Sequence, residues 1–216
     1  FKQKTAYEIM PSLVGSEMCI RDRDRRYQID KWIPSGSKIL DLGCGDGSFL
    51  KDLSEKKEIT GFGVENDFEK INLCIKNGVS VLHHDIDDGV KEFSGMDFDI
   101  TIMASSIQCV RNPKRVLKDI LKVSKRCIIT IPNFGYWKIR FGLFNGRMPI
   151  SKRLPNKWYE TKNIHLCTIK DFEELCLNNE LKIIEKHFLN EDGESIKNTF
   201  LANLFAAEGV YLVGSR

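Results

Sequence analysis

Apolar positions follow two patterns that alternate along the chain. Short runs of consecutive apolar residues are typical of strands buried on both faces, whereas the stretches between them place apolar residues every three or four positions, as helices do. Strands are therefore expected at residues 38–42, 60–65, 79–82, 98–103 and 127–131, and helices at 27–33, about 48–55 and about 68–76, from Asn112-Pro113 onward and from Thr168 onward. This alternation predicts an α/β fold with a doubly wound, mostly parallel sheet.

The last part of the chain departs from this alternation. Residues 181–188 and 209–213 are expected to form two closing strands that pair in antiparallel fashion. The two helices before them are expected to turn the following residues inward: Val116, Leu117, Ile120 and Leu121 in one, and Phe172, Leu175 and Cys176 in the other. The fold class is thus a mostly parallel sheet completed by an antiparallel C-terminal strand pair.

Local signals mark the ends of two helices. Thr168 and Asp171 have the spacing of a capping box, which begins the last helix. Asn77-Gly78 ends the helix at 68–76, which carries Phe68, Ile71 and Ile75 on one stripe.

A glycine-rich turn follows the first strand. It reads Asp41-Leu-Gly43-Cys44-Gly45-Asp-Gly47, with three glycines at a spacing of two and a helical pattern directly after them. Glycine is needed where the backbone takes a positive φ or where a ligand lies against the main chain. We expect a strand that turns sharply into a helix and leaves the backbone open to a ligand.

An acidic residue, Glu65, lies at the end of the second strand, about 20 residues past the glycines, where a carboxylate accepts hydrogen bonds from a ribose diol. The dinucleotide fingerprint G-x-G-x-x-G fails because Ser48 occupies its third glycine position, and the phosphate-binding loop G-x-x-x-x-G-K-[ST] is absent. Asp41 would repel a pyrophosphate and suits a cationic group. The predicted ligand is an adenosine derivative that carries positive charge.

Composition fits one globular domain. The chain has 216 residues, of which 42% are hydrophobic and 29% charged, and its net charge of +3 is too small to predict binding to nucleic acid or membranes. Its seven cysteines contain no C-x-x-C pair, which favours buried thiols in a reducing cytoplasm over disulfides or a metal site. His83 and His84 lack metal-binding partners at suitable spacing, and the sequence shows no membrane-spanning segment or secretory signal.

Residues 1–23 have no clear periodicity and do not connect to the pattern of the remaining chain. They resemble translated adapter sequence, and the alternative is a genuine but poorly ordered extension. We expect them to carry no functional information and residues 24–216 to form a single domain.

The connection between the strand at 127–131 and the helix at Thr168 is unusually long and aromatic. Residues 134–159 contain six basic side chains and no acidic one. Long connections in compact domains usually carry function. Three interpretations remain open: a lid over an anionic substrate, a docking surface for a partner protein, or a basic solvated face over a small aromatic core. For docking, the candidate residues are Trp137, Arg147, Arg153, Trp158 and Tyr159.

The glycine turn and its acids resemble the class I S-adenosylmethionine-dependent methyltransferases, which have a Rossmann-like fold. A wider set of segments resembles the MetW family of methionine biosynthesis proteins over residues 25–213; the first three are shared by many methyltransferases, and those from 131 to 168 are far more restrictive. These segments are 41–47, 61–65, 85–87, 131–137, 146–149, 158–159, 163–168 and 203–206.

The resemblance implies a set of roles. S-adenosylmethionine would be the cofactor, Asp85 would accept the adenine amino group, and the backbone amide of Ile86 would donate to the ring. The full set of expected cofactor-binding residues is Asp41, Gly43, Cys44, Gly45, Gly47, Glu65, Asn66, Asp85 and Ile86. The MetW family is bacterial and associated with the homoserine O-acyltransferase MetX, so the resemblance also implies a cytoplasmic protein with that partner.

Catalytic residues are not evident in the sequence. The segment 104–109 lacks the Asn- or Asp-Pro-Pro-Tyr run that many amino-group methyltransferases carry after their fourth strand. His165 and Tyr159 are the best candidates for a base or a substrate contact, and a structural role for the histidine is equally compatible with the pattern. Two hypotheses therefore stay open. The first is an active methyltransferase with a small-molecule acceptor. The second is a regulatory subunit that binds S-adenosylmethionine, or has lost that ability, and supports a homoserine acyltransferase through residues 134–168.

Overall fold

The structure is a computed structural model that describes residues 23–215. The predicted extension, residues 1–23, lies outside the described residues except for Arg23. In chain order the elements are α2 (Arg23–Trp32), β1 (Lys38–Leu42), α3 (Ser48–Lys57), β2 (Thr60–Glu65), α4 (Phe68–Lys76), β3 (Ser80–His83), the 3-10 turns η1 (Ile86–Asp88) and η2 (Lys91–Phe93), β4 (Phe98–Ala104), the 3-10 turn η3 (Ile107–Cys109), α5 (Pro113–Val123), β5 (Ser124–Pro132), α6 (Trp137–Phe144), α7 (Ile169–Asn178), β6 (Leu181–Leu189), α8 (Ala202–Phe205) and β7 (Glu208–Ser215).

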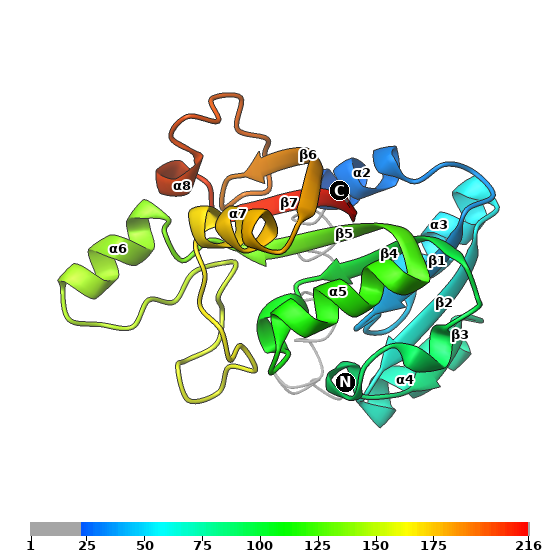
Figure 1. Ribbon diagram of the computed structural model, residues 1–216. Coiled ribbons are helices and arrows are strands. Elements are labelled where there is room, and N and C mark those ends of the chain that lie inside the picture. Colours follow the sequence, from blue (N-terminus) through cyan, green and yellow to red (C-terminus); the bar gives the residue numbers. More distant parts are fainter. Residues whose placement is uncertain (1–22, 216) are drawn as a thin grey trace, which may run out of the picture.

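Seven strands form one sheet in the order β3-β2-β1-β4-β5-β7-β6 (Figure 1). The first five pair in parallel, whereas β7 is antiparallel to both β5 and β6. This confirms the predicted doubly wound, mostly parallel sheet with its antiparallel C-terminal pair. The carboxyl ends of β1, β2 and β4 therefore meet at one edge, where open α/β sheets bind their ligands.

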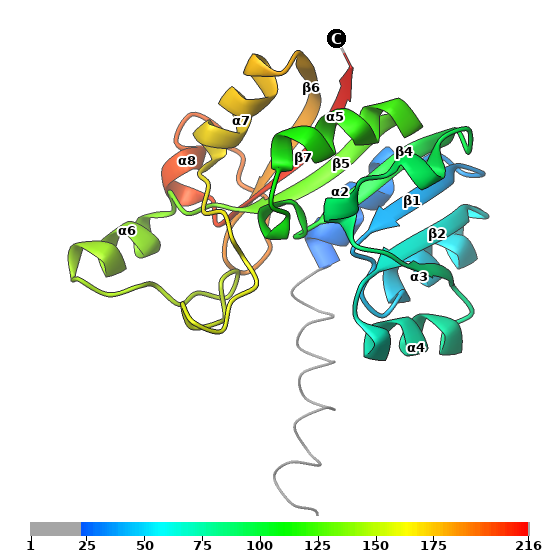
Figure 2. The same cartoon turned by 60° about the horizontal axis from the view of Figure 1, so that its bottom comes forward.

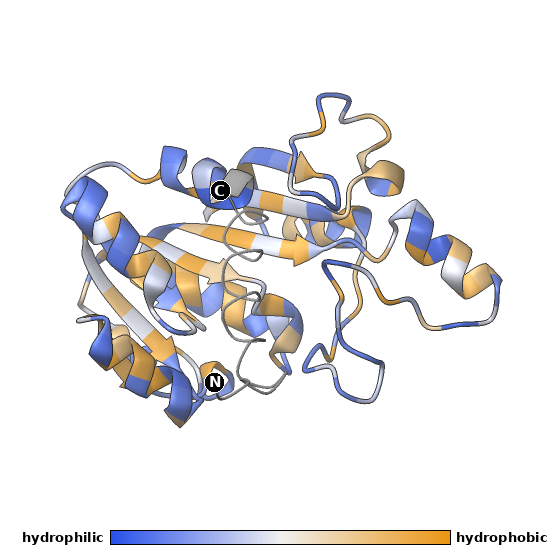
Figure 3. Ribbon diagram, turned by 180° about the vertical axis from the view of Figure 1, so that it is seen from behind, coloured by the Kyte–Doolittle hydropathy of each residue, from blue (hydrophilic) through white to orange (hydrophobic). Residues whose placement is uncertain are grey.

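Successive strand residues face opposite sides of the sheet, so each side has its own core. On one side α5 and α7 pack Val116, Ile120 and Phe172 against strand residues such as Leu40 and Ile129. On the other side the core joins α2, α3 and Cys74 of α4 to alternate strand residues, including Ile39, Ile102 and Ile128. Figure 3 shows orange, apolar bands along the strands of the sheet. No helix among residues 23–215 has the length and hydropathy needed to cross a membrane.

The predicted stripe on α4 does not face the core. Phe68 and Ile75 are 66% and 63% exposed, and Cys74 is the buried residue of this helix. Helix α4 packs on β3, a four-residue strand at the sheet edge, which offers too little surface to cover a second apolar face. The capping box at the start of α7 is formed as predicted, with Thr168 and Asp171 bonding each other's backbone amides.

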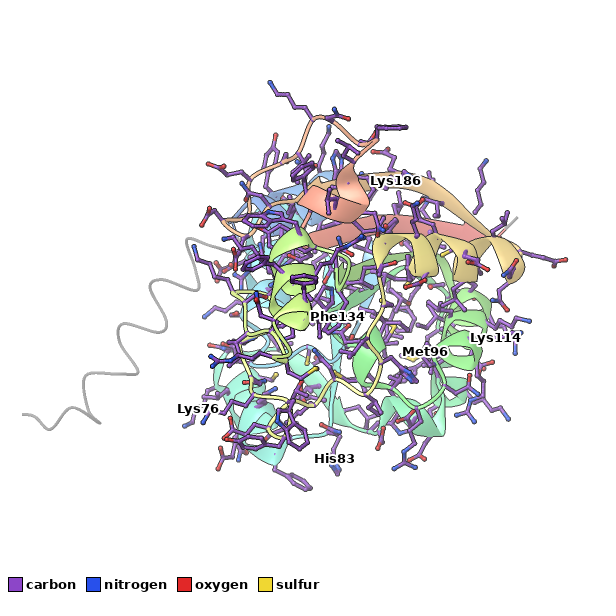
Figure 4. The ribbon with its side chains drawn as sticks, turned by 90° about the vertical axis from the view of Figure 1, so that its left-hand side faces the viewer. Lys76, His83, Met96, Lys114, Phe134 and Lys186 are labelled. Atoms are coloured by element: carbon purple, nitrogen blue, oxygen red, sulfur yellow. The ribbon has the colours of Figure 1, made fainter. Side chains whose placement is uncertain are left out.

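Helix α6 was not predicted and extends away from the sheet, as both views in Figures 1 and 2 show. Its base is held by a small third core of Tyr136, Ile139, Leu154 and Ala207. Phe134, labelled in Figure 4, packs against this core. The rest of the helix is open to solvent: Phe141 and Phe144 are 64% and 88% exposed. We call α6 and the connection up to residue 155 the arm.

Candidate functional site

A cavity of about 850 Å³ opens at the carboxyl edge of the parallel strands. Five of the nine expected cofactor-binding residues line it: Gly43, Glu65, Asn66, Asp85 and Ile86. The other four, Asp41, Cys44, Gly45 and Gly47, are absent from its lining and belong to the end of β1 and the turn behind the cavity wall. The sequence therefore predicted one wall of this cleft and the backbone turn that supports it.

The glycine turn adopts the conformation that the sequence predicts. Gly43, Gly45 and Gly47 have φ values of 84°, 62° and 74°, in the left-handed region that side chains disfavour. The amides of Gly43 and Cys44 both donate to the carbonyl of Val64, at 2.8 and 3.1 Å, which fastens the turn to the end of β2.

Glu65 holds this turn from the neighbouring strand. It is 7% exposed; its Oε2 accepts from the amide of Gly45 at 3.0 Å, and its Oε1 accepts from the amides of Asn66 and Asp67 at 3.0 and 3.1 Å. A carboxylate offers about four acceptor sites, so the three amides leave room for one ligand hydroxyl without rearrangement. Glu65 thus holds the turn, lines the cleft and keeps one acceptor site that the three amides do not use.

Asp41 is buried beneath the turn, with 3% of its surface exposed, and its Oδ1 has no hydrogen-bond partner among the described residues. Burial, and secondarily the negative charge of Glu65, raises the pKa of Asp41 to about 7. A buried carboxylate without a partner is costly. Asp41 and Glu65 together therefore create a negative electrostatic potential next to the cleft, which a cationic group of a ligand would neutralise.

Asp85 lies at the outer lip of the cleft. Its side chain is exposed, and its Oδ1 accepts from the amide of Asp87 at 2.9 Å, which caps η1. Ile86 is the first residue of that turn. The residue that was expected to hold adenine is thus fixed in position by a local turn.

Two thiols lie behind the glycine turn. Cys44 and Cys74 have their Sγ atoms 3.8 Å apart, and the Cys74 thiol also donates to the Gly45 carbonyl at 3.1 Å. Burial raises the pKa of both thiols above the usual value, which keeps them protonated. Their role is packing, because the neutral sulfurs fill the space between the turn and α4.

Gly63 leaves room for one of these sulfurs. A Cβ added at Gly63 would lie 2.5 Å from the Cys44 Sγ. We expect Gly63→Ala to lower the free energy of unfolding by about 1–3 kcal/mol, because the core at this point is already full. Urea denaturation measures the change. Combining it with Cys44→Ala, which removes the sulfur, is expected to cost less than the sum of the two single variants; simple additivity would contradict this contact.

The opposite wall of the cleft comes from two distant parts of the chain. Ser105, Ser106 and Cys109 follow β4, and residues 156–164 contribute Asn156, Glu160, Lys162, Asn163 and Ile164. Ser105 has a φ of 57°, and its amide donates to Thr130 Oγ1 at 2.9 Å. Sequence reasoning missed that these segments meet; the one available signal was the unusual length of the connection.

The two catalytic candidates do not belong to this lining. His165 is exposed, its ring lies 3.4 Å from the Arg111 carbonyl, and its amide donates to the Gln108 carbonyl. Tyr159 is 60% exposed and packs edge-on against Trp158. Within residues 23–215 there is also no cluster of three metal-ligating side chains.

Comparison with known proteins identifies the family. The family described as methionine biosynthesis protein MetW matches residues 23–213. The chain belongs to the MetW family. A curated relative, the bifunctional methionine biosynthesis protein MetXA/MetW of Rhodopirellula baltica, is 31% identical over 192 residues, which cover 82% of this chain. The match spans only 30% of that relative's length.

Solved structures show the fold of this MetW-family chain. An S-adenosylmethionine-dependent methyltransferase from Archaeoglobus fulgidus is similar with a TM-score of 0.67 and 16% identity, covering 98% of this chain and all of the other. The plantazolicin methyltransferase BpumL in complex with S-adenosylhomocysteine is similar with a TM-score of 0.61 and 19% identity, covering 93% and 84% of the two chains. The fold is therefore that of the class I methyltransferases.

The expected docking residues of this MetW-family chain divide into two groups. Trp137, Trp158 and Tyr159 are 44%, 69% and 60% exposed, and Arg147 is exposed as well. Arg153 is different: its side chain is 10% exposed, and its Nη1 lies 3.1 Å from Oε2 of the buried Glu208. The carboxylate of Glu208, 55 positions later in the chain, thus holds Arg153 away from the exposed surface that the other four residues share, and its docking role stays a prediction.

Proposed function

We propose that this MetW-family protein binds S-adenosylmethionine in the cleft and supports a homoserine O-acyltransferase of the MetX type. The assignment of the ligand rests on Glu65. This residue is buried at the end of β2, lines the cleft and is oriented by three backbone amides. A ribose hydroxyl takes its open acceptor site, and the adenine lies against Asp85 and the amide of Ile86.

The residues at the cleft fit this ligand in charge as well as shape. The unpartnered Oδ1 of Asp41 and the nearby Glu65 favour a cationic nucleoside over a phosphate-bearing one. The glycine turn presents backbone without side chains to it. Bound S-adenosylmethionine supplies a sulfonium methyl group. The protein's own residues, Gly43 and Asn66 among them, hold the nucleoside and limit its contact with water.

The partner assignment rests on different observations. The R. baltica relative carries the names MetXA and MetW in a single chain. Among residues 23–215, the arm of this protein leaves Phe141, Phe144 and Arg147 exposed. Aromatic residues and arginine are typical of interface centres. The six cysteines of residues 23–215 are all free, which fits action in the cytoplasm.

An active methyltransferase is the second candidate function. It is favoured by the size of the cleft, which continues past the cofactor residues to Ser105, Ser106 and Asn163 and leaves space for an acceptor. Methyl transfer needs chiefly alignment of the acceptor with the sulfonium. In that case a small molecule binds against the wall made by residues 105–109 and 156–164.

Docking through the arm and the adjoining residues 156–159 is tested by copurification with the acyltransferase. We expect Trp137→Ala and Trp158→Ala each to weaken the complex at least tenfold, because exposed aromatic side chains dominate interface energies. Tyr27→Ala is the matched control, since Tyr27 is 62% exposed on α2. Acyltransferase activity, measured with and without this protein, should rise with the wild type and rise less with the two tryptophan variants. A complex that is equally tight for all variants would contradict docking through the arm and residues 156–159.

A further inference from the structure

One short segment of the chain faces the cleft and the solvent at the same time. Residues 156–164, which we call the strap, line the cleft with five side chains, among them Glu160, Lys162 and Asn163. Trp158 and Tyr159, which lie between Asn156 and Glu160 in the chain, are 69% and 60% exposed, with their ring centres 5.5 Å apart. Because Tyr159 is directly followed by Glu160 of the cleft wall, a displacement of the exposed aromatic pair is expected to move the cleft wall as well.

The strap is fastened to the protein at one end. The amides of Ile164 and His165 both donate to the Gln108 carbonyl, at 2.9 and 3.0 Å, and the Cys109 thiol donates to Asn163 Oδ1 at 3.4 Å. These partners belong to η3, which itself lines the cleft through Cys109. Toward the middle, the bonds are local: the amides of Glu160 and Thr161 donate to the Lys157 carbonyl.

The outer face of the strap has a defined chemistry. Lys157 lies 5.6 Å from the centre of the Tyr159 ring, and both flank Trp158. Across residues 134–159 there are six basic residues and no acidic one. Lys138 and Lys152 are neutralised by Glu191 and Asp192, whereas Arg147 and Lys157 are exposed at the surface. A protein that covers this face therefore needs an acidic rim around an apolar centre.

We infer that the strap couples the cleft to the docked partner, so that S-adenosylmethionine and the acyltransferase strengthen each other's binding. This inference rests on the proposed function and adds its regulation. A partner that presses on Trp158 and Tyr159 fixes the strap and with it Glu160, Lys162 and Asn163 in the cleft wall. A ligand in the cleft then meets a wall already in place, and thermodynamic linkage makes the effect reciprocal. The acyltransferase would thereby respond to the level of S-adenosylmethionine.

The test measures the affinity for S-adenosylmethionine by calorimetry, first with the protein alone and then with a saturating amount of the acyltransferase. We expect binding to be about 5- to 150-fold tighter in the complex, which is the usual range of coupling. Asn163→Ala, which removes the bond to Cys109, should retain the ligand-free complex and lose most of this gain, whereas Tyr27→Ala should keep all of it.

The possible failures are distinguishable. Equal affinity for S-adenosylmethionine with and without a formed complex overturns the coupling and leaves the proposed function standing. If Asn163→Ala shows the full gain in affinity for S-adenosylmethionine on adding the acyltransferase, the coupling is also overturned, because the strap would then not transmit it. No binding of S-adenosylmethionine to the protein alone, or no complex with the acyltransferase, overturns the proposed function and the coupling with it.

Discussion

Glu65→Ala is expected to weaken the binding of S-adenosylmethionine roughly 30- to 150-fold, or about 2–3 kcal/mol. The variant removes the carboxylate that accepts the ribose hydroxyl. It also leaves the amides of Gly45, Asn66 and Asp67 without the carboxylate that holds the turn. Equilibrium dialysis with labelled ligand measures the effect. Glu65→Gln should not restore binding, because its amide nitrogen would face backbone N–H groups whichever way it turns.

The control for this experiment is Glu69→Ala. Glu69 is an exposed glutamate on α4, four residues away, and its change alters net charge by the same amount. We expect it to bind like the wild type. Equal affinity of wild type and Glu65→Ala would remove Glu65 from the binding site.

Asp41→Asn is expected to stabilise the ligand-free protein at pH 8 and to do so less at lower pH. The pKa of Asp41 is raised to about 7 in the folded state, so the folded protein retains a proton that the unfolded chain releases above about pH 4. Stability of the wild type therefore falls as pH rises from about 4 to about 7. At pH 8 the deprotonated Asp41 lowers the stability of the folded wild type by about 4 kcal/mol. Asparagine avoids this cost, but its own unpaired amide group costs about 1–3 kcal/mol.

Urea denaturation at pH 8 and at pH 4 measures this difference. At pH 8 we expect Asp41→Asn to be about 2 kcal/mol more stable than the wild type. Between pH 8 and pH 4 this difference should shift by about 4 kcal/mol in favour of the wild type, because only the wild type titrates here. Binding should change in the opposite sense: the affinity of the wild type for the cationic ligand should rise between pH 5.5 and 7, and that of Asp41→Asn should stay flat. A stability difference that is the same at both pH values would contradict a buried, high-pKa carboxylate at this position.

The parts of the fold that follow from local signals could be predicted from the sequence. The bounds of β2 and α4 agree with prediction because Asp67 caps the helix and Asn77-Gly78 ends it. The backbone of the glycine turn was equally accessible, since only glycine adopts three positive φ values in five residues at low cost.

The parts that depend on contacts far apart in the chain could not be predicted. Helix α6 has apolar residues on all sides and no side-chain cap at Tyr136, so neither periodicity nor capping marks it. Nothing near Arg153 in the chain points to its partner Glu208. The second wall of the cleft needs residues 105–109 and 156–164 to meet, and nothing local in either segment indicates this.

A side-chain-free turn and two buried carboxylates are proposed here to form a site for a cationic nucleoside. The decisive experiment is calorimetric titration of the wild-type chain with S-adenosylmethionine at pH 8. We expect saturable binding of one molecule per chain. Absence of saturable heat at ligand concentrations up to about 1 mM, where even weak sites fill, would contradict such a site.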